Sequence, residues 1–197
     1  MKFLRHLLIT LSSATVFCAT AWAADAVASR VKLATNLGDV VIELNANAAP
    51  VTVANFVSYV KDKHYDGTIF HRVIDGFMIQ GGGYDPKYQE RPTKAPIAHE
   101  GRSALQKGGP RNQIGTIAMA RTQDPNSATA QFFINVSDNA FLDPSAQSPG
   151  YVAFGHVVSG MDVVNRIKSL PTGPGGPFRS DVPRTAVIIQ SATIVTP

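Results

Sequence analysis

The sequence predicts a mainly β protein, a closed eight-stranded antiparallel β-barrel capped by two α-helices. About eight short stretches alternate apolar and polar residues with a period of two, and turn residues separate them. Only two stretches repeat apolar residues at helical spacing. Many short strands accompanied by few helices are typical of a closed all-β architecture.

Residues 1–23 have the pattern of a signal peptide that is cleaved during export. Lys2 and Arg5 form a basic start, an apolar stretch follows, and small residues precede the expected cleavage site after Ala23, with Ala21 as the alternative. The apolar stretch is too short to span a bilayer by itself. We therefore expect the protein in the periplasm and not as a membrane protein.

The mature chain is expected to hold one domain over 31–197, preceded by a short extension over 24–30. Loss of the leader leaves 16 basic and 14 acidic residues, so the net charge falls from +4 to +2. This balance, without any run of basic residues, does not favour nucleic acid as a partner. Cys18 is the single cysteine and lies in the leader, which excludes disulfides, a thiolate nucleophile and zinc–sulfur sites from the mature chain.

The first elements after the leader are a hairpin and a helix. Residues 31–35 and 40–44 alternate on either side of a turn. Pro50 stands where the first turn of a helix tolerates proline, and apolar residues at helical spacing follow to about Tyr65. The apolar face of this helix is expected to pack on the strands.

A second hairpin over 69–80, with an Asp-Gly turn in its middle, is the most informative stretch. Period-two alternation places Phe70, Arg72 and Ile74 on one face of its first strand. A guanidinium among apolar side chains is costly to desolvate, so it either reaches solvent or serves a ligand. His71 faces the other way and is more simply structural.

The rest of the chain is expected to add a long loop, four strands and the second helix. Residues 84–113 are rich in proline and glycine and predict an ordered loop that borders the site. The helix is predicted over 160–170 and an irregular loop over 171–177, PTGPGGP. The strands are predicted over 115–120, 131–135, 151–158 and 186–195.

The strand over 131–135 carries a second group of candidate site residues. Gln131, Phe133 and Asn135 share one face, and the opposite face is ordinary core. A phenyl ring between two amides suits an apolar ligand with backbone-like polar groups. Motifs for a catalytic triad, a phosphate loop, a dinucleotide site or a zinc protease are absent from the sequence. The chain therefore binds without reaction, or catalyses a reaction that needs neither covalent nor metal chemistry.

Four motifs in order along the chain resemble those of the cyclophilin-type peptidyl-prolyl cis-trans isomerases. They are FHR at 70–72, GFMIQGG at 76–82, MA at 119–120 and QFFI at 131–134. The resemblance runs from about Val31 to the C-terminus and, with the leader, is strongest to periplasmic members of Gram-negative bacteria. It implies the barrel that the strand count predicts, isomerisation of X–Pro bonds, and no cofactor.

The resemblance also implies roles for individual residues. Arg72 would be catalytic, and Gln80 would orient Arg72 and the peptide. We expect Phe133 to be partly exposed to the cleft, which would keep the stability cost of its truncation below that of a buried phenylalanine. The implied contacts with the peptide are made by Phe77, Met78, Ala120, Arg121, Gln131, Phe133, Phe141, Leu142 and Tyr151.

Three residues depart from the common eukaryotic pattern of the family: Phe141 replaces a tryptophan, Tyr151 a histidine and Arg121 an asparagine. Members that bind cyclosporin tightly have that tryptophan, so the resemblance implies weak cyclosporin binding here. The expected partners are proline-containing polypeptide clients, bound by a monomer.

Two alternatives to the isomerase interpretation stay open. The first is a non-catalytic peptide-binding chaperone on the same barrel, against which the presence of both Arg72 and Gln80 counts. The second is a lipocalin-like barrel around a small ligand, which is disfavoured because Phe, Met and Leu side chains would fill so small a lumen.

Overall fold

The structure is a computed structural model that describes residues 30–195. The predicted signal peptide lies outside the described residues, and Arg30, assigned above to the extension, already opens the first strand. The helices are α1 (Pro50–Lys61), α2 (Gly101–Gln106) and α3 (Met161–Lys168), with 3₁₀ turns η1 (Pro125–Ser127) and η2 (Ala140–Leu142). The strands are β1 (Arg30–Thr35), β2 (Gly38–Leu44), β3 (Thr68–Ile74), β4 (Met78–Gly81), β5 (Thr116–Met119), β6 (Phe132–Asn135), β7 (Ala153–Ser159), β8 (Thr172–Gly175), β9 (Phe178–Pro183) and β10 (Ile188–Val195).

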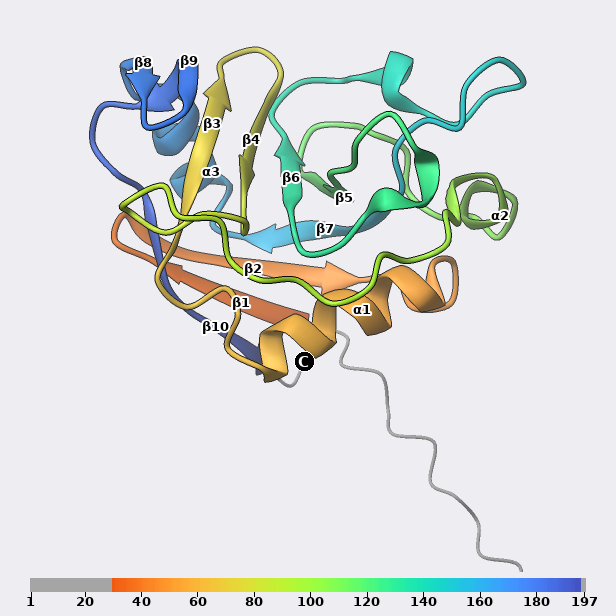
Figure 1. Ribbon diagram of the computed structural model, residues 1–197. Coiled ribbons are helices and arrows are strands. Elements are labelled where there is room, and N and C mark those ends of the chain that lie inside the picture. The colour runs from red at the N-terminus through yellow and green to blue at the C-terminus, as the bar shows by residue number, and fades with distance from the viewer. Residues whose placement is uncertain (1–29, 196–197) are drawn as a thin grey trace, which may run out of the picture.

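Eight strands close into a barrel in the order β1-β10-β3-β4-β6-β5-β7-β2, and every pairing is antiparallel. The predicted fold class is thereby confirmed. The helix α1 runs below β1 and β2, whereas α3 lies at the upper left behind β3 and β4 (Figure 1). The two predicted helices thus pack on different parts of the barrel.

Buried apolar side chains of the strands and of α1 fill the barrel core, with aromatic rings among them. Phe56 of α1 contacts the rings of Tyr65, Phe132 and Phe154 with centroid separations of 5.1, 5.6 and 5.2 Å, and all four residues are completely buried. Such tilted and edge-to-face ring pairs add to the energy of burial. A filled lumen speaks against the lipocalin-like alternative, which needs an internal ligand cavity.

The long segment over 84–113 is attached to the rest of the fold by hydrogen bonds to α1. The carboxylate of Glu100 accepts hydrogen bonds from the backbone N–H groups of Val51 (3.1 Å) and Thr52 (2.7 Å) in the first turn of α1. A carboxylate there satisfies orphan donors and complements the helix dipole.

The helices differ from the prediction in two respects. The segment over 84–113 contains the short helix α2, which the sequence did not predict, and α1 ends at Lys61, one turn earlier than expected. No described helix is both long enough and apolar enough to cross a membrane.

The prediction of an irregular loop over 171–177 was wrong. Thr172–Gly175 forms β8, which pairs with β9 in a small separate hairpin. Proline removes a donor from a strand, but a two-stranded ladder has two free edges where no donor is required. The turn between the strands packs against the ring of Tyr88 so closely that a Cβ at Gly176 would have no room.

A bulge in β3 corrects the predicted arrangement of its side chains. Phe70 pairs with Gly81 and Arg72 pairs with Gln80, so His71 is an extra residue without a partner on β4. The alternation breaks there, and Phe70 turns into the barrel core together with Val73. Arg72 therefore does not share a face with Phe70. A bulge that re-aims one side chain is a common device beside functional sites.

Candidate functional site

A second apolar cluster lies outside the barrel core, on the outer face of β4, β5 and β6. Phe133 belongs to this cluster, whereas its neighbours Phe132 and Ile134 belong to the core. The buried members are Met78, Ala118, Phe133 and Ala153, and the partly buried members are Ile74, Phe77, Ala120, Leu142 and Tyr151. Six residues that the resemblance assigned to a peptide pocket are thus brought together: Phe77, Met78, Ala120, Phe133, Leu142 and Tyr151.

Phe133 is more buried than expected, because only 4% of its surface is exposed. Its ring stands edge-on to Tyr151 at a centroid separation of 5.6 Å. The expectation that it would be partly exposed to the cleft was therefore wrong. Tyr151 packs against it at the rim.

Arg72, Gln80 and Phe133 lie in one row across three strands, since Arg72 pairs with Gln80 and Gln80 pairs with Phe133. The side-chain amide of Gln80 donates to Gln131 Oε1 at 3.0 Å. Within residues 30–195, Gln80 makes no hydrogen bond to Arg72. The Arg72 guanidinium makes no hydrogen bond or ion pair with any residue of this range. Gln131 in turn lies over Gly83, where an added Cβ would come within 2.6 Å of Gln131 Cδ.

Arg121 clamps two loops at the rim of the cluster. Its guanidinium donates to the carbonyl oxygen of Gly150 from Nε (3.0 Å) and Nη2 (2.9 Å), and to that of Thr122 from Nη1 (2.7 Å). The same group lies 4.5 Å from the ring centroid of Tyr151, a cation–π contact. The Arg121 side chain therefore holds the 148–151 segment in place.

Phe141 forms the exposed edge of the site. Its ring is 72% exposed and stacks on Phe77 with a centroid separation of 5.8 Å and an interplanar angle of 25°. Phe77 itself lies in the turn before β4, so its side chain does not have to follow the alternation of Met78 and Gln80. This removes the conflict between Phe77 and Gln80 that a strict period of two would impose.

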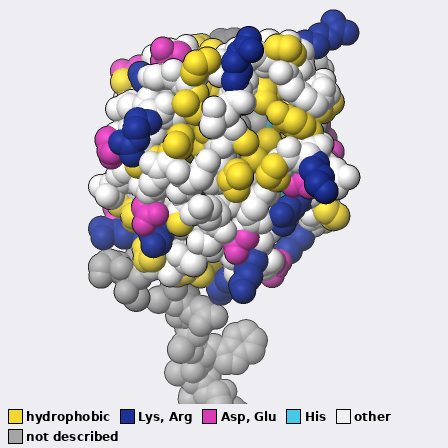
Figure 2. Space-filling view, turned by 90° about the vertical axis from the view of Figure 1, so that its left-hand side faces the viewer, with side chains coloured by type: hydrophobic (Ala, Val, Ile, Leu, Met, Phe, Trp, Pro, Cys, Tyr) yellow, Lys and Arg dark blue, Asp and Glu magenta, His cyan; other side chains and the backbone are white. Residues whose placement is uncertain are grey.

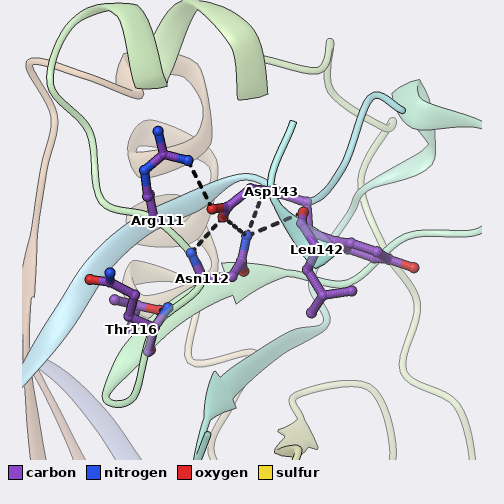
Figure 3. Close-up of polar contacts among 7 residues, drawn as sticks. Arg111, Asn112, Thr116, Leu142 and Asp143 are labelled. Atoms are coloured by element: carbon purple, nitrogen blue, oxygen red, sulfur yellow. Dashed lines mark hydrogen bonds and ion pairs between the residues drawn. The ribbon is translucent and has the colours of Figure 1, made fainter. Parts of the chain in front are cut away.

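Asn135 was wrongly placed among the ligand-facing residues. Its side chain is fully buried, and its Nδ2 donates to Thr116 Oγ1 at 3.0 Å. It belongs to a buried polar group that bonds the backbone of residues in the cluster around Phe133, a group that the sequence did not predict. An asparagine at the end of the otherwise apolar strand FFIN is the signal that could have indicated it. Figure 3 shows another part of this group, where Asn112 and Asp143 face one another beside Leu142.

His71 lies against the small hairpin and is structural, as expected. Its ring stacks on Phe178 (5.2 Å, 28°) and contacts Tyr84 edge-on (4.8 Å). Burial, helped by the neighbouring charge of Arg72, lowers the pKa of His71 to about 4. The imidazole is therefore neutral at physiological pH and adds no charge beside Arg72.

The lowered pKa of His71 predicts loss of stability in acid. Between the unfolded value of 6.5 and about 4, the unfolded chain binds a proton that the folded chain does not, so the free energy of unfolding falls as the pH falls. The loss attributable to His71 is about 3 kcal/mol across this window. Urea denaturation of the wild type and of His71→Gln between pH 7 and pH 4.5 measures it. Burial also lowers the pKa of His64 and of His99, but both residues are present in the two proteins. Equal pH dependence would therefore contradict the assignment to His71.

Comparison with known proteins decides the family. The model of the cyclophilin type peptidyl-prolyl cis-trans isomerase family matches residues 30–194, nearly all of the described chain. The chain belongs to the cyclophilins. As a member it is an enzyme of the peptidyl-prolyl cis-trans isomerase class, and the fold class and the resemblance drawn from its motifs are confirmed.

Several bacterial relatives are similar to this cyclophilin over most of their length. A peptidyl-prolyl cis-trans isomerase of Streptomyces antibioticus is 53% identical over 170 residues, covering 85% of this chain and 99% of its own. Peptidyl-prolyl cis-trans isomerase B of Escherichia coli is 52% identical, covering 81% and 96%. Peptidyl-prolyl cis-trans isomerase A of Dickeya dadantii is 46% identical over 187 residues, covering 95% and 94%.

A solved structure shares the fold of this cyclophilin. The crystal structure of a cyclophilin type isomerase of Cryptosporidium parvum, determined in the presence of the dipeptide Ala-Pro, superposes with a TM-score of 0.69 at 26% sequence identity. The match covers 85% of this chain and 99% of that one.

Proposed function

We propose that the cluster around Phe133 holds the proline ring of a polypeptide and that Arg72 catalyses rotation about the preceding peptide bond. The observation that carries this proposal is the row of Arg72, Gln80 and Phe133. It sets a guanidinium without an internal partner among residues 30–195 beside the apolar cluster around Phe133. In this proposal, a proline ring that packs on the cluster has its nitrogen on the side of Arg72 and Gln80.

The energetics of the bond make one arginine sufficient for much of the catalysis. Rotation of an amide crosses a barrier of about 18–20 kcal/mol because resonance is lost, and uncatalysed X–Pro exchange takes tens to hundreds of seconds. A turnover of about ten per second needs roughly a thousandfold acceleration, or about 4 kcal/mol. A charge-assisted hydrogen bond supplies about 1.5–3 kcal/mol of this.

The timing of the Arg72 contact makes it catalytic. As the bond twists, the prolyl nitrogen becomes pyramidal and gains a lone pair that Arg72 can hydrogen-bond. This interaction exists only in the transition state, so it lowers the barrier in both directions. Gln80, tied to Gln131, would orient the peptide in this scheme, and the apolar cluster would hold the ring while the preceding carbonyl rotates. No cofactor enters the scheme.

The clients in this proposal are exported proteins that fold in the periplasm. The leader pattern over 1–23 supports export, and the alignment with the Dickeya dadantii isomerase A, over 187 residues, extends into this N-terminal region. The mass of the protein recovered from the periplasm tests this, since cleavage after Ala23 removes 23 residues. Figure 2 shows acidic and basic side chains scattered among one another around a hydrophobic area, which supports polypeptide rather than nucleic-acid partners.

The alternative is a chaperone that binds peptides on the same surface without catalysis. A proline-isomerisation assay on a short peptide distinguishes the two functions, because a pure binding protein would leave the exchange rate unchanged. The availability of the Arg72 guanidinium favours the enzyme.

Inhibition by cyclosporin is expected to be weak, because Phe141 keeps an apolar surface but lacks an indole N–H. Losing that donor costs about 1 kcal/mol, and more where the acceptor is buried. Phe141→Trp should therefore tighten inhibition about fivefold or more at similar peptide turnover. Titration of both proteins with the drug measures this. Equal inhibition constants would mean that Tyr151 or the 143–150 loop, and not Phe141, determines how tightly the drug binds.

A further inference from the structure

Four buried polar residues form a continuous hydrogen-bonded group beneath the pocket, here called the asparagine network. Its members are Asn112, Asn135, Asn139 and Asp143, and each is at most 8% exposed. Asn139 Nδ2 donates to Asn135 Oδ1 at 2.7 Å, and Asn135 Nδ2 donates to Asn112 Oδ1 at 3.3 Å. Asn112 donates to Asp143 Oδ1 from its backbone N at 2.7 Å and from Nδ2 at 3.1 Å.

The network ends on backbone atoms of residues that line the pocket. At one end, Asn139 Nδ2 donates its second hydrogen to the carbonyl oxygen of Phe77 at 2.9 Å. At the other end, Asn112 Nδ2 lies within bonding distance of the carbonyl oxygens of Leu142 (3.3 Å) and Tyr151 (3.2 Å). Phe77, Leu142 and Tyr151 come from two connections far apart in the sequence, and the network holds both.

The same contacts explain how an irregular loop keeps a fixed shape at the site. The excursion over 143–150 leaves the barrel after Leu142 and returns at Tyr151, whose N–H donates to the Leu142 carbonyl at 2.8 Å. Asp143, at the start of the excursion, is bound on its outer side by Arg111 Nη1 at 3.1 Å (Figure 3). The inner side of its carboxylate faces Asn112.

Buried amides tolerate few alternative arrangements. A buried donor or acceptor left without a partner is costly, so the segments that the network joins cannot shift independently of one another. Apolar side chains of similar size could fill the same volume without fixing direction. The use of three asparagines therefore points to a requirement for position as well as for packing.

We propose that the asparagine network positions the proline pocket, and that Asn112 and Asn139 are positioning residues for the isomerase reaction. This inference rests on the proposed function, since it takes the cluster around Phe133 as the place where proline binds. The network reaches Phe77, Leu142 and Tyr151 through their backbone and does not touch Arg72. Its loss should therefore act on binding of the ring more than on the chemical step.

The test compares Asn112→Ala and Asn139→Ala with the wild type in a proline-isomerisation assay, at a temperature where denaturation curves show each protein folded. Because misplacement by about 1 Å can cost a hundredfold, we expect kcat/KM to fall about tenfold in each variant, mainly through KM. Asn139→Ser keeps one of the two donors and should retain an intermediate kcat/KM, which provides a milder variant should an alanine variant fail to fold.

The matched control is Asn36→Ala. Asn36 also makes two hydrogen bonds through its side chain, accepting from Ile188 N (2.8 Å) and donating to Ala186 O (2.9 Å), but these join a turn to β10. It should lower stability and leave kcat/KM within about twofold of the wild type.

The double variant Asn112→Ala/Asn139→Ala separates a shared network from two independent contacts. If both residues act through one network, the double variant should lose less than the product of the single losses. The inference would be overturned if the folded Asn112→Ala, Asn139→Ala and Asn139→Ser proteins all had a normal KM. A loss of activity confined to kcat would also overturn it. A wild-type protein without isomerase activity would instead overturn the proposed function.

Discussion

Replacing Arg72 by alanine is expected to lower kcat about a hundredfold, the typical cost of removing one preorganised donor to transition-state charge. The fold should persist, because the half-buried side chain makes no hydrogen bond or ion pair within residues 30–195 and contributes little to the core. Activity against a short proline peptide and thermal melting are measured side by side. Arg72→Lys should recover only part of the rate, since it keeps the charge and loses the planar fork.

The control for Arg72→Ala is Arg166→Ala. Arg166 is also half exposed. On α3 it forms an ion pair with the exposed Asp162 at 2.8 Å and donates to the carbonyl oxygen of Leu37 at 3.0 Å, so its removal should lower the Tm slightly and leave the activity unchanged. Wild-type turnover in a folded Arg72→Ala protein would refute the mechanism proposed here.

The largest loss of stability at the site is expected from Phe133→Ala. Because the ring is 4% exposed, its truncation should cost the full 3–5 kcal/mol of a buried phenylalanine. This corresponds to a fall in Tm of about 10 °C for a domain of this size. Peptide binding should weaken as well, since the proposed function has the proline ring pack on Phe133.

Phe141→Ala is the matched control for Phe133→Ala. Its ring is 72% exposed, so truncation should leave the Tm almost unchanged. Thermal melting and peptide titration of both variants measure the contribution of each ring to stability and to peptide binding. A Phe133→Ala protein that melts with the wild type, or that binds peptide as tightly, would contradict the position of this ring between pocket and barrel.

Much of the site could be predicted because its residues stand in short motifs on regular strands. Arg72, Gln80 and Phe133 lie in one row once β3, β4 and β6 pair, and alternation already separates Phe133 from its core neighbours. The filled barrel follows in the same way from counting alternating stretches and helical periods.

The errors arose where the chain departs from simple periodicity. The bulge at His71 reverses the side-chain directions on β3, and nothing in the local sequence indicates an inserted residue. The side chain of Asn135 hydrogen-bonds Asn112 and Thr116, which are distant in sequence. Alternation does not reveal such partners, so it predicted a ligand-facing side chain. The hairpin of β8 and β9 packs against Tyr88, a residue distant in sequence, and no local sequence rule includes such a contact.

The position of the site on the outer wall of a filled barrel decides what kind of substrate can use it. A molecule that enters a lumen must present an end or be small enough to be enclosed. Here the row of Arg72, Gln80 and Phe133 crosses the outside of three neighbouring strands. A segment in the middle of a long polypeptide can lie across such a surface without threading, while the chain on either side is already folding.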